Sequence, residues 1–115
     1  QVWGCFADRY ATAYTGIDVV PGRYYHIIGV YDYDKSEMRV YVDGQAAGSV
    51  SVAGLMDYPD GLAQYFCIGG DASFNADIAE YPLNGEVALV RMYSHALTLG
   101  EAKKLYNDLQ EISAE

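Results

Sequence analysis

Oxygen-bearing side chains are concentrated between residues 71 and 86. They include Asp71, Asn75, Asp77, Glu80 and Asn84. Carboxylate, amide and main-chain carbonyl oxygens are the ligands that calcium prefers, and residues 71–82 have no regular hydrophobic period, which predicts a polar loop. The sequence therefore offers a candidate calcium site on Asp71, Asn75 and Asp77. A solvated acidic loop is the alternative, because the spacing of these residues is not diagnostic of a metal site.

The chain has 12 tyrosines, and some of them fall in expected loops or at the ends of expected strands. An aromatic ring exposed at such a place offers an apolar face on which a sugar ring can stack. We therefore take Tyr14, Tyr58 and Tyr81 as candidate carbohydrate-binding residues. Tyrosine also suits half-buried strand positions, and this structural role is the alternative. Four further tyrosines are expected in the core: Tyr25, Tyr31, Tyr41 and Tyr93.

Histidine and cysteine form no recognisable catalytic or metal-binding motif. His26 and His95 are the only two histidines, and the side chain of the neighbouring Ser94 points away from His95 in an extended backbone, so we expect structural roles. Cys5 and Cys67 stand 62 positions apart, which excludes a CxxC redox motif and a zinc knuckle. The sequence leaves two alternatives for these cysteines. They are either two buried free thiols or one disulfide that closes a long loop.

The net charge is −9, from 16 acidic and 7 basic residues. Clustered Lys and Arg are absent, so we expect no binding to nucleic acid, whose phosphates such a chain would repel. No apolar run is long enough to span a bilayer, which predicts no membrane insertion. A length of 115 residues suits one domain with one modest core, and we expect residues 1–115 to form it.

A period of two dominates the chain and predicts antiparallel strands. Residues 23–31 have apolar side chains on both faces, as in an inner strand of a sandwich, and residues 38–44 follow as the second strand of a hairpin that ends in the tight turn Asp43-Gly44. Further strands are expected at residues 46–52, 63–70 and 85–93. Residues 1–20 are expected to contribute one or two more.

A single helix is expected near the end of the chain. Thr98 and Glu101 fit a capping box, in which each side chain satisfies a main-chain amide near the other residue. The helix then carries one apolar stripe that must lie against the strands, because a short isolated helix is marginal in water. The stripe consists of Ala102, Leu105, Tyr106 and Leu109.

These motifs, taken in order, resemble the concanavalin A-like lectin/glucanase superfamily, and within it the laminin G-like jelly-roll domains. The resemblance rests on the strand and Asp at residues 24–32, the Tyr-Val-Asp-Gly turn at residues 41–44, and the pair Ile68-Gly69. It also rests on the end of the chain, where Arg91, Tyr93, Ala96, Leu97 and Glu101 match the closing strand and helical turn. It implies an all-β, antiparallel jelly-roll β-sandwich with a short C-terminal α-helix.

The resemblance implies a non-catalytic recognition module of an extracellular or cell-surface protein, with carbohydrate as the first ligand class and with calcium at the rim of the sandwich. Domains of this family are longer, so we expect the chain to be part of a larger polypeptide that supplies further N-terminal strands. The alternative is a structural accessory domain that packs against a neighbouring hydrolase or phosphoesterase domain and binds no ligand. A glycoside hydrolase ranks last, because the glucanases use a Glu-x-Asp-x-x-Glu strand and the nearest match, at residues 75–80, begins with Asn75.

Overall fold

The computed structural model describes the backbone of residues 2–6, 9–54, 68–69 and 83–114, and the side chains of residues 11–54, 68–69 and 83–112. It divides into two compact units. The first contains Gln1–Asp57 together with Tyr93–Glu115, and the second contains Tyr58–Met92. The described strands and the helix all belong to the first unit.

A three-stranded antiparallel sheet forms the centre of the first unit. Its strands are β3 (Ile27–Asp32), β4 (Glu37–Val42) and β5 (Gln45–Ser51), in the order β3-β4-β5. The turn between β4 and β5 has φ values of 51° at Asp43 and 74° at Gly44, the left-handed geometry that tight hairpin turns require. The hairpin and the weaker strand expected from the sequence are therefore confirmed, with a bulge where the register shifts between Val40 and Tyr41.

The prediction for residues 23–31 is wrong in two respects. The strand begins only at Ile27, because the turn at Pro21 and Gly22 brings the Arg23 amide to the carbonyl oxygen of Val20 at 3.3 Å. The side chains of β3 also alternate, with Ile27 61% exposed and Val30 5% exposed. The strand that is buried on both faces is β4, because Met38 packs in a hydrophobic cluster on one face and Tyr41 packs in another cluster on the other face.

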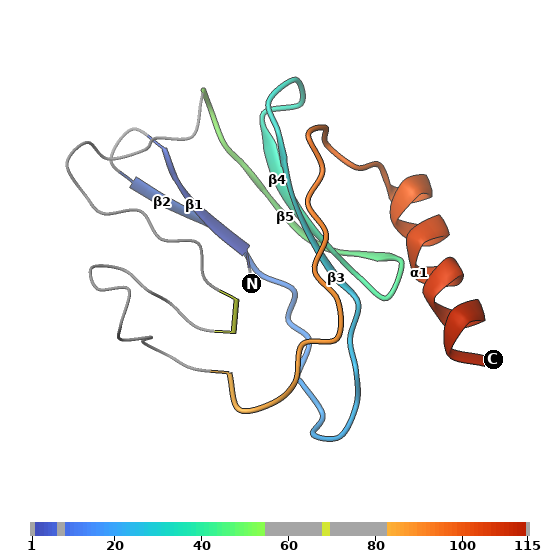
Figure 1. Ribbon diagram of the computed structural model, residues 1–115. Coiled ribbons are helices and arrows are strands. Elements are labelled where there is room, and N and C mark those ends of the chain that lie inside the picture. The colour runs from blue at the N-terminus through green and yellow to red at the C-terminus, as the bar shows by residue number, and fades with distance from the viewer. Residues whose placement is uncertain (1, 7–8, 55–67, 70–82, 115) are drawn as a thin grey trace. The chain divides into compact units, whose positions relative to one another are not determined.

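A second pair of strands lies near the start of the chain. Strands β1 (Val2–Phe6) and β2 (Arg9–Ala13) pair antiparallel, with Val2 opposite Ala13. This confirms the expectation of one or two strands in residues 1–20. Strand β2 lies beside β5, and Figure 1 shows the β3-β4-β5 sheet between the β1-β2 pair on one side and helix α1 (Leu99–Ala114) on the other.

Each face of the three-stranded sheet contributes to a small hydrophobic core. On one face, Met38 and Val52 pack with Ala11, Tyr31 and Val50. On the other face, the helix covers the sheet through one cluster. Its members are Val30, Tyr41, Leu97 and Ala102, with Ile28, Ala96 and Leu105 packed against them. The antiparallel strands with one C-terminal helix confirm the predicted fold class.

The apolar stripe of the helix faces inward as expected. Ala102 is fully buried, Leu105, Tyr106 and Leu109 are half-buried, and Lys104 is exposed. Tyr41 is buried as predicted, whereas Tyr25 and Tyr31 are only half-buried. The prediction that Tyr93 belongs to the core is wrong, because its side chain is 44% exposed. Leu97, four residues further along the chain, is buried in the core instead.

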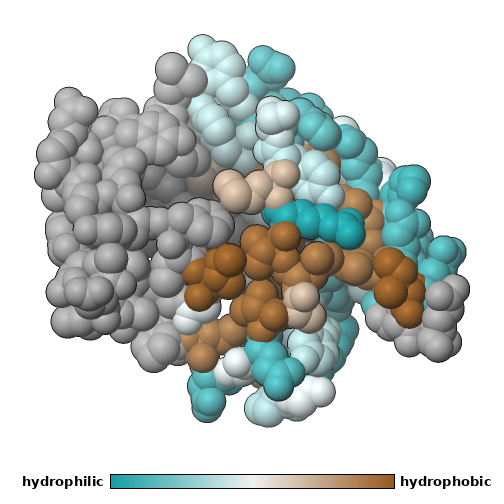
Figure 2. All heavy atoms as spheres, viewed as in Figure 1, coloured by the Kyte–Doolittle hydropathy of each residue, from teal (hydrophilic) through white to brown (hydrophobic). Residues whose placement is uncertain are grey.

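The second unit is described at residues 68–69 and 83–92. The alternation at residues 85–93 predicts a strand, and within the described residues this backbone pairs with no other strand. A ladder needs a neighbouring chain, so this strand stays a prediction. Its apolar side chains are exposed and contribute to the brown surface in Figure 2. Inside this unit, the Leu83 amide donates to the carbonyl oxygen of Gly69 at 2.7 Å. Most of the expected strand at 63–70 and all of the loop at 71–82 lie outside the described residues.

Candidate functional site

Tyr14 is the one predicted site residue that falls in the described part of the chain. It follows directly after β2, and its side chain is 69% exposed. The other two candidate sugar-binding residues, Tyr58 and Tyr81, lie outside the described residues. The same holds for the candidate calcium ligands Asp71, Asn75 and Asp77.

The backbone of Tyr14 is held in place by a close approach to β5. A Cβ atom added at Gly48 would fall on the carbonyl oxygen of Tyr14, so glycine alone lets the two backbones come this close. The preceding residue, Ala13, is fully buried. On the other side, the hydroxyl of Thr15 accepts a hydrogen bond from the Ile17 amide at 3.1 Å. Tyr14 is therefore an exposed ring on a firmly anchored stretch of backbone.

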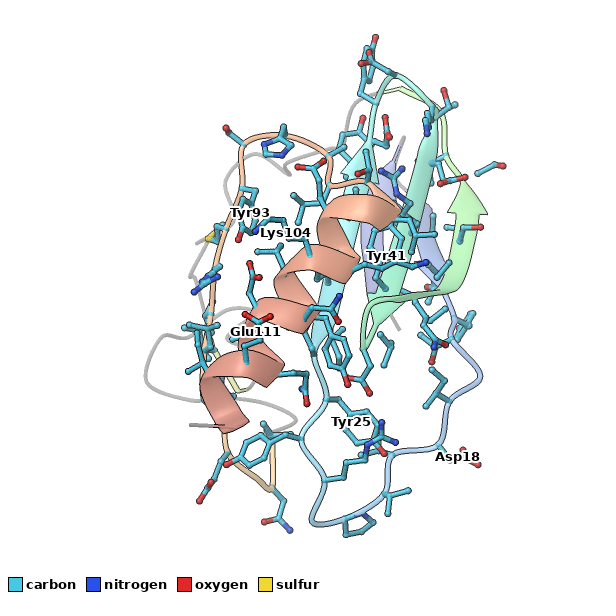
Figure 3. The ribbon with its side chains drawn as sticks, turned by 90° about the vertical axis from the view of Figure 1, so that its right-hand side faces the viewer. Asp18, Tyr25, Tyr41, Tyr93, Lys104 and Glu111 are labelled. Carbon is cyan, nitrogen blue, oxygen red and sulfur yellow. The ribbon has the colours of Figure 1, made fainter. Side chains whose placement is uncertain are left out.

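A buried arginine joins the sheet to the start of the helix. Arg39 Nη1 lies 2.7 Å from Asp32 Oδ2, Nη2 donates to the carbonyl oxygen of Leu97 at 2.7 Å, and Nε donates to the Tyr41 hydroxyl at 2.5 Å. The hydrogen bond from Arg39, followed by that from the Lys35 amide, lowers the pKa of Asp32. Figure 3 shows Tyr41 on the sheet and Lys104 on the helix in front of it. The arrangement connects the sheet to the start of the helix, and all three guanidinium nitrogens are hydrogen-bonded within the protein.

A recess of about 380 Å³ lies beside this arginine, between β4, β5 and the first residues of the helix. Polar side chains line part of it: Lys35, Glu37, Arg39, Ser49 and Thr98. Glu37 Oε1 lies 3.4 Å from Arg39 Nη1, so the arginine and this acid are already engaged with each other. The recess therefore lies beside residues that already hold the sheet and the helix together.

The capping box at the helix start is present as predicted. The Glu101 amide donates to Thr98 Oγ1 at 3.2 Å, and the Thr98 amide donates to Glu101 Oε1 at 3.1 Å. His95 Nε2 lies 3.0 Å from the other carboxylate oxygen of Glu101. The hydrogen bond with His95, together with those from Thr98, lowers the pKa of Glu101. His95 thus supports the helix cap, a structural role.

His26 also takes part in packing. Its amide donates to Asp43 Oδ1 at 2.9 Å, and its carbonyl oxygen accepts from the Asp43 amide at 2.8 Å. Its ring stacks on that of Tyr106, with centroids 6.1 Å apart. Asp43 is held further by Arg23, whose Nη2 lies 2.6 Å from Oδ2. The segment before β3 is thereby attached both to the β4–β5 turn and to the helix.

Two properties of the described residues bear on function. Within the side chains of 11–54, 68–69 and 83–112, no cluster of three His, Cys, Asp or Glu residues is close enough to bind a metal ion. Of the helical residues that the structure describes, none forms a span with the length and hydropathy needed to cross a bilayer.

The comparisons with known proteins agree with this architecture. A laminin G family model, described as the concanavalin A-like lectin/glucanases superfamily, matches residues 2–103. This chain therefore belongs to that superfamily, as the motifs predicted. No curated protein matches it.

A similar solved structure is that of an S-layer domain-containing protein (residues 221–444) from Clostridium thermocellum. The TM-score is 0.51 at 18% sequence identity, with 85% of this chain and 45% of the other chain covered. At this identity the likeness concerns the fold, and the present chain spans less than half of that neighbour.

Sequence reasoning missed the Arg39 arrangement. Arg39 alternates with Met38 and Val40 along the strand, and that pattern does not indicate its contacts with Asp32 and Leu97. An arginine in the middle of an apolar strand, with an aspartate at the end of the preceding strand, was the available signal.

Proposed function

We propose that this domain is a non-catalytic recognition module of an extracellular or cell-surface protein, and that it binds carbohydrate. Membership of a superfamily that includes lectins supports the ligand class, and the likeness to an S-layer domain-containing protein supports the location. Both supports are analogies of fold. The proposal therefore needs a feature of this chain's own surface.

Tyr14 is that feature. An exposed tyrosine ring presents a broad apolar face, and here the backbone beneath it is fixed by the contact with Gly48. A backbone that is already held in position limits the conformational entropy lost when a sugar stacks on the ring. Tyr58 and Tyr81 remain proposed carbohydrate-binding residues in their own right.

The acidic residues support a non-catalytic role. In the described residues, Asp32 is paired with Arg39, Asp43 with Arg23 and Asp108 with Lys104. Such pairs stabilise the carboxylates in their charged form and tie them to structural partners. The nearest match to the glucanase motif has Asn75 at the first position, which supplies no carboxylate for attack on a glycosidic carbon.

A structural accessory domain is the second candidate. The loop between β2 and β3 exposes apolar side chains, namely Ile17, Val19, Val20 and Tyr24. A group of exposed apolar residues favours burial against another protein surface. On this alternative, the neighbouring domain of the same polypeptide covers the loop and the module has no ligand.

A glycan array tests the proposal. The purified domain is expected to bind at least one class of glycan, and Tyr14→Ala is expected to reduce that binding. Tyr33→Ala is the matched control, because Tyr33 is also exposed but lies in the turn between β3 and β4. Both variants should keep the melting temperature of the parent. A folded parent domain that binds no glycan would support the accessory role instead.

A further inference from the structure

A second recess, of about 430 Å³, lies between the β4–β5 turn and the outer part of the helix. It lies wholly within the first unit. The turn contributes one wall and the helix contributes the other. The residues that line it are Asp43, Gly44, Gln45 and Ala46 from the turn, and Leu99, Lys103, Tyr106 and Asn107 from the helix.

The walls of this recess are fixed by close packing. A Cβ atom at Gly44 would lie 3.2 Å from Cδ1 of Tyr106, so the turn and the helix are in close contact at this point, at the edge of the recess. Tyr106 also stacks on the ring of His26. Asp43 receives hydrogen bonds from Arg23 and from the His26 amide, and Arg23 Cζ lies 4.6 Å from the centroid of the Tyr25 ring. The recess is thus preorganised.

The polar side chains that line this recess differ from those around Arg39 in their hydrogen bonding. Gln45, Lys103 and Asn107 are exposed, and within the side chains described they make no hydrogen bond. Each amide offers both a donor and an acceptor, and the lysine offers three donors. Sugar hydroxyls both donate and accept hydrogen bonds, so they suit this mixture of groups. The half-buried Tyr106 adds an apolar surface for the sugar ring.

The charges of the recess favour an acidic ligand. The carboxylate of Asp43 is balanced by the guanidinium of Arg23 at 2.6 Å. On the helix, Lys104 is paired with Asp108 at 2.9 Å, but Lys103 has no such partner among the described residues. The ammonium group of Lys103 therefore has no paired acid among the described side chains. Because salt screens exposed charges beyond about 8–10 Å, this local charge attracts an anionic group in the recess although the chain as a whole carries a net charge of −9.

We propose that this recess binds an acidic sugar unit, with its carboxylate on Lys103, its hydroxyls on Gln45 and Asn107, and its ring against Tyr106. The inference rests on the proposed carbohydrate-binding function and adds to it a second subsite, apart from Tyr14, and a class of sugar. The recess would contribute specificity, and the exposed tyrosine would contribute apolar contact.

Isothermal titration of the whole domain with an oligogalacturonate tests the subsite. Lys103→Ala is expected to weaken binding about tenfold, as the loss of a charged hydrogen bond does, and Asn107→Ala and Gln45→Ala are expected to weaken it less. Lys104→Ala is the matched control on the same helix and should bind as the parent does. The neutral oligogalactose of the same length should bind more weakly than the oligogalacturonate.

The outcomes separate this inference from the proposed function. If the parent binds glycans in a manner sensitive to Tyr14→Ala, but Lys103→Ala and Asn107→Ala bind as the parent does, the recess is excluded and the function stands. Equal binding of the neutral and the acidic oligosaccharide would overturn the assignment of an acidic ligand. A folded domain that binds no sugar in either assay would overturn both proposals.

Discussion

Arg39 and Leu97 lie 58 positions apart in the sequence and are joined by a hydrogen bond of 2.7 Å from the guanidinium to the main-chain oxygen. The Tyr41 hydroxyl lies 3.3 Å from the same oxygen. Because Leu97 is buried and directly precedes the helix cap, its carbonyl group needs a partner inside the protein. The central strand provides that partner and thereby sets where the helix begins on the sheet.

Replacement of Arg39 should be costly. Arg39→Met would leave the Asp32 carboxylate and the Leu97 carbonyl oxygen without their partner, and we expect a loss of about 3 kcal/mol in the free energy of unfolding. Urea denaturation measures the loss. Arg23→Met is the control, since the Arg23 side chain is 57% exposed and its removal should cost about 1 kcal/mol or less. Similar losses in the two variants would contradict a special role for Arg39.

Stability should fall in acid through Asp32. Its pKa is lowered in the folded state, chiefly by Arg39, so the folded protein holds this proton less tightly than the unfolded chain does. The stabilisation is therefore complete above the ordinary Asp pKa of about 3.9 and is lost as the pH falls through the lower, folded value. Asp32→Asn should be less stable than the parent at pH 7, and its stability should depend less on pH in this range. Parallel curves of melting temperature against pH would argue against the pairing.

The helix cap gives a local prediction. Thr98→Ala removes the acceptor for the Glu101 amide and should lower the free energy of unfolding by about 1 kcal/mol. Thr98→Ser keeps the hydroxyl and should stay close to the parent. Thermal melts followed by far-ultraviolet circular dichroism measure both variants, and an equal effect of the two would mean that the hydroxyl is not the stabilising group.

Gly48 should matter both for stability and for binding. In Gly48→Ala the new methyl group would meet the carbonyl oxygen of Tyr14, and overpacking of this kind costs about 1–3 kcal/mol. The backbone that carries Tyr14 must also shift, so glycan binding should weaken. Ser49→Ala, at the next and exposed position of β5, should change neither property. Unchanged melting and binding in Gly48→Ala would show that the close approach is not required.

The candidate calcium ligands call for a separate measurement. Acidic surface loops are commonly solvated, so we expect the same melting temperature with calcium chloride and with a chelator. A rise with calcium that Asp71→Ala or Asp77→Ala abolishes would instead assign the metal to residues 71–86. Asp34→Ala, in the turn between β3 and β4, is a suitable control for a general effect of charge.

The sequence determined the features that depend on residues close together in the chain. The Asp43-Gly44 turn, the Thr98–Glu101 cap and the inward stripe of the helix all lie where local pattern placed them. Each depends on backbone preferences and on contacts within one turn or hairpin, so a short window of sequence contains all the required information. The candidate role of Tyr14 also follows from such a window, because it stands just beyond an alternating strand.

Only the tertiary structure decided which of these elements meet. It joined Leu97 to Arg39 by a hydrogen bond and exposed Ile27 at one edge of the sheet. It also brought Gln45 and Asn107 to the same recess. Alternation tells which side chains share a face, but it does not tell what covers that face or which strand has two neighbours. Those facts depend on contacts between distant segments, whose free energy is gained only when the whole chain has packed.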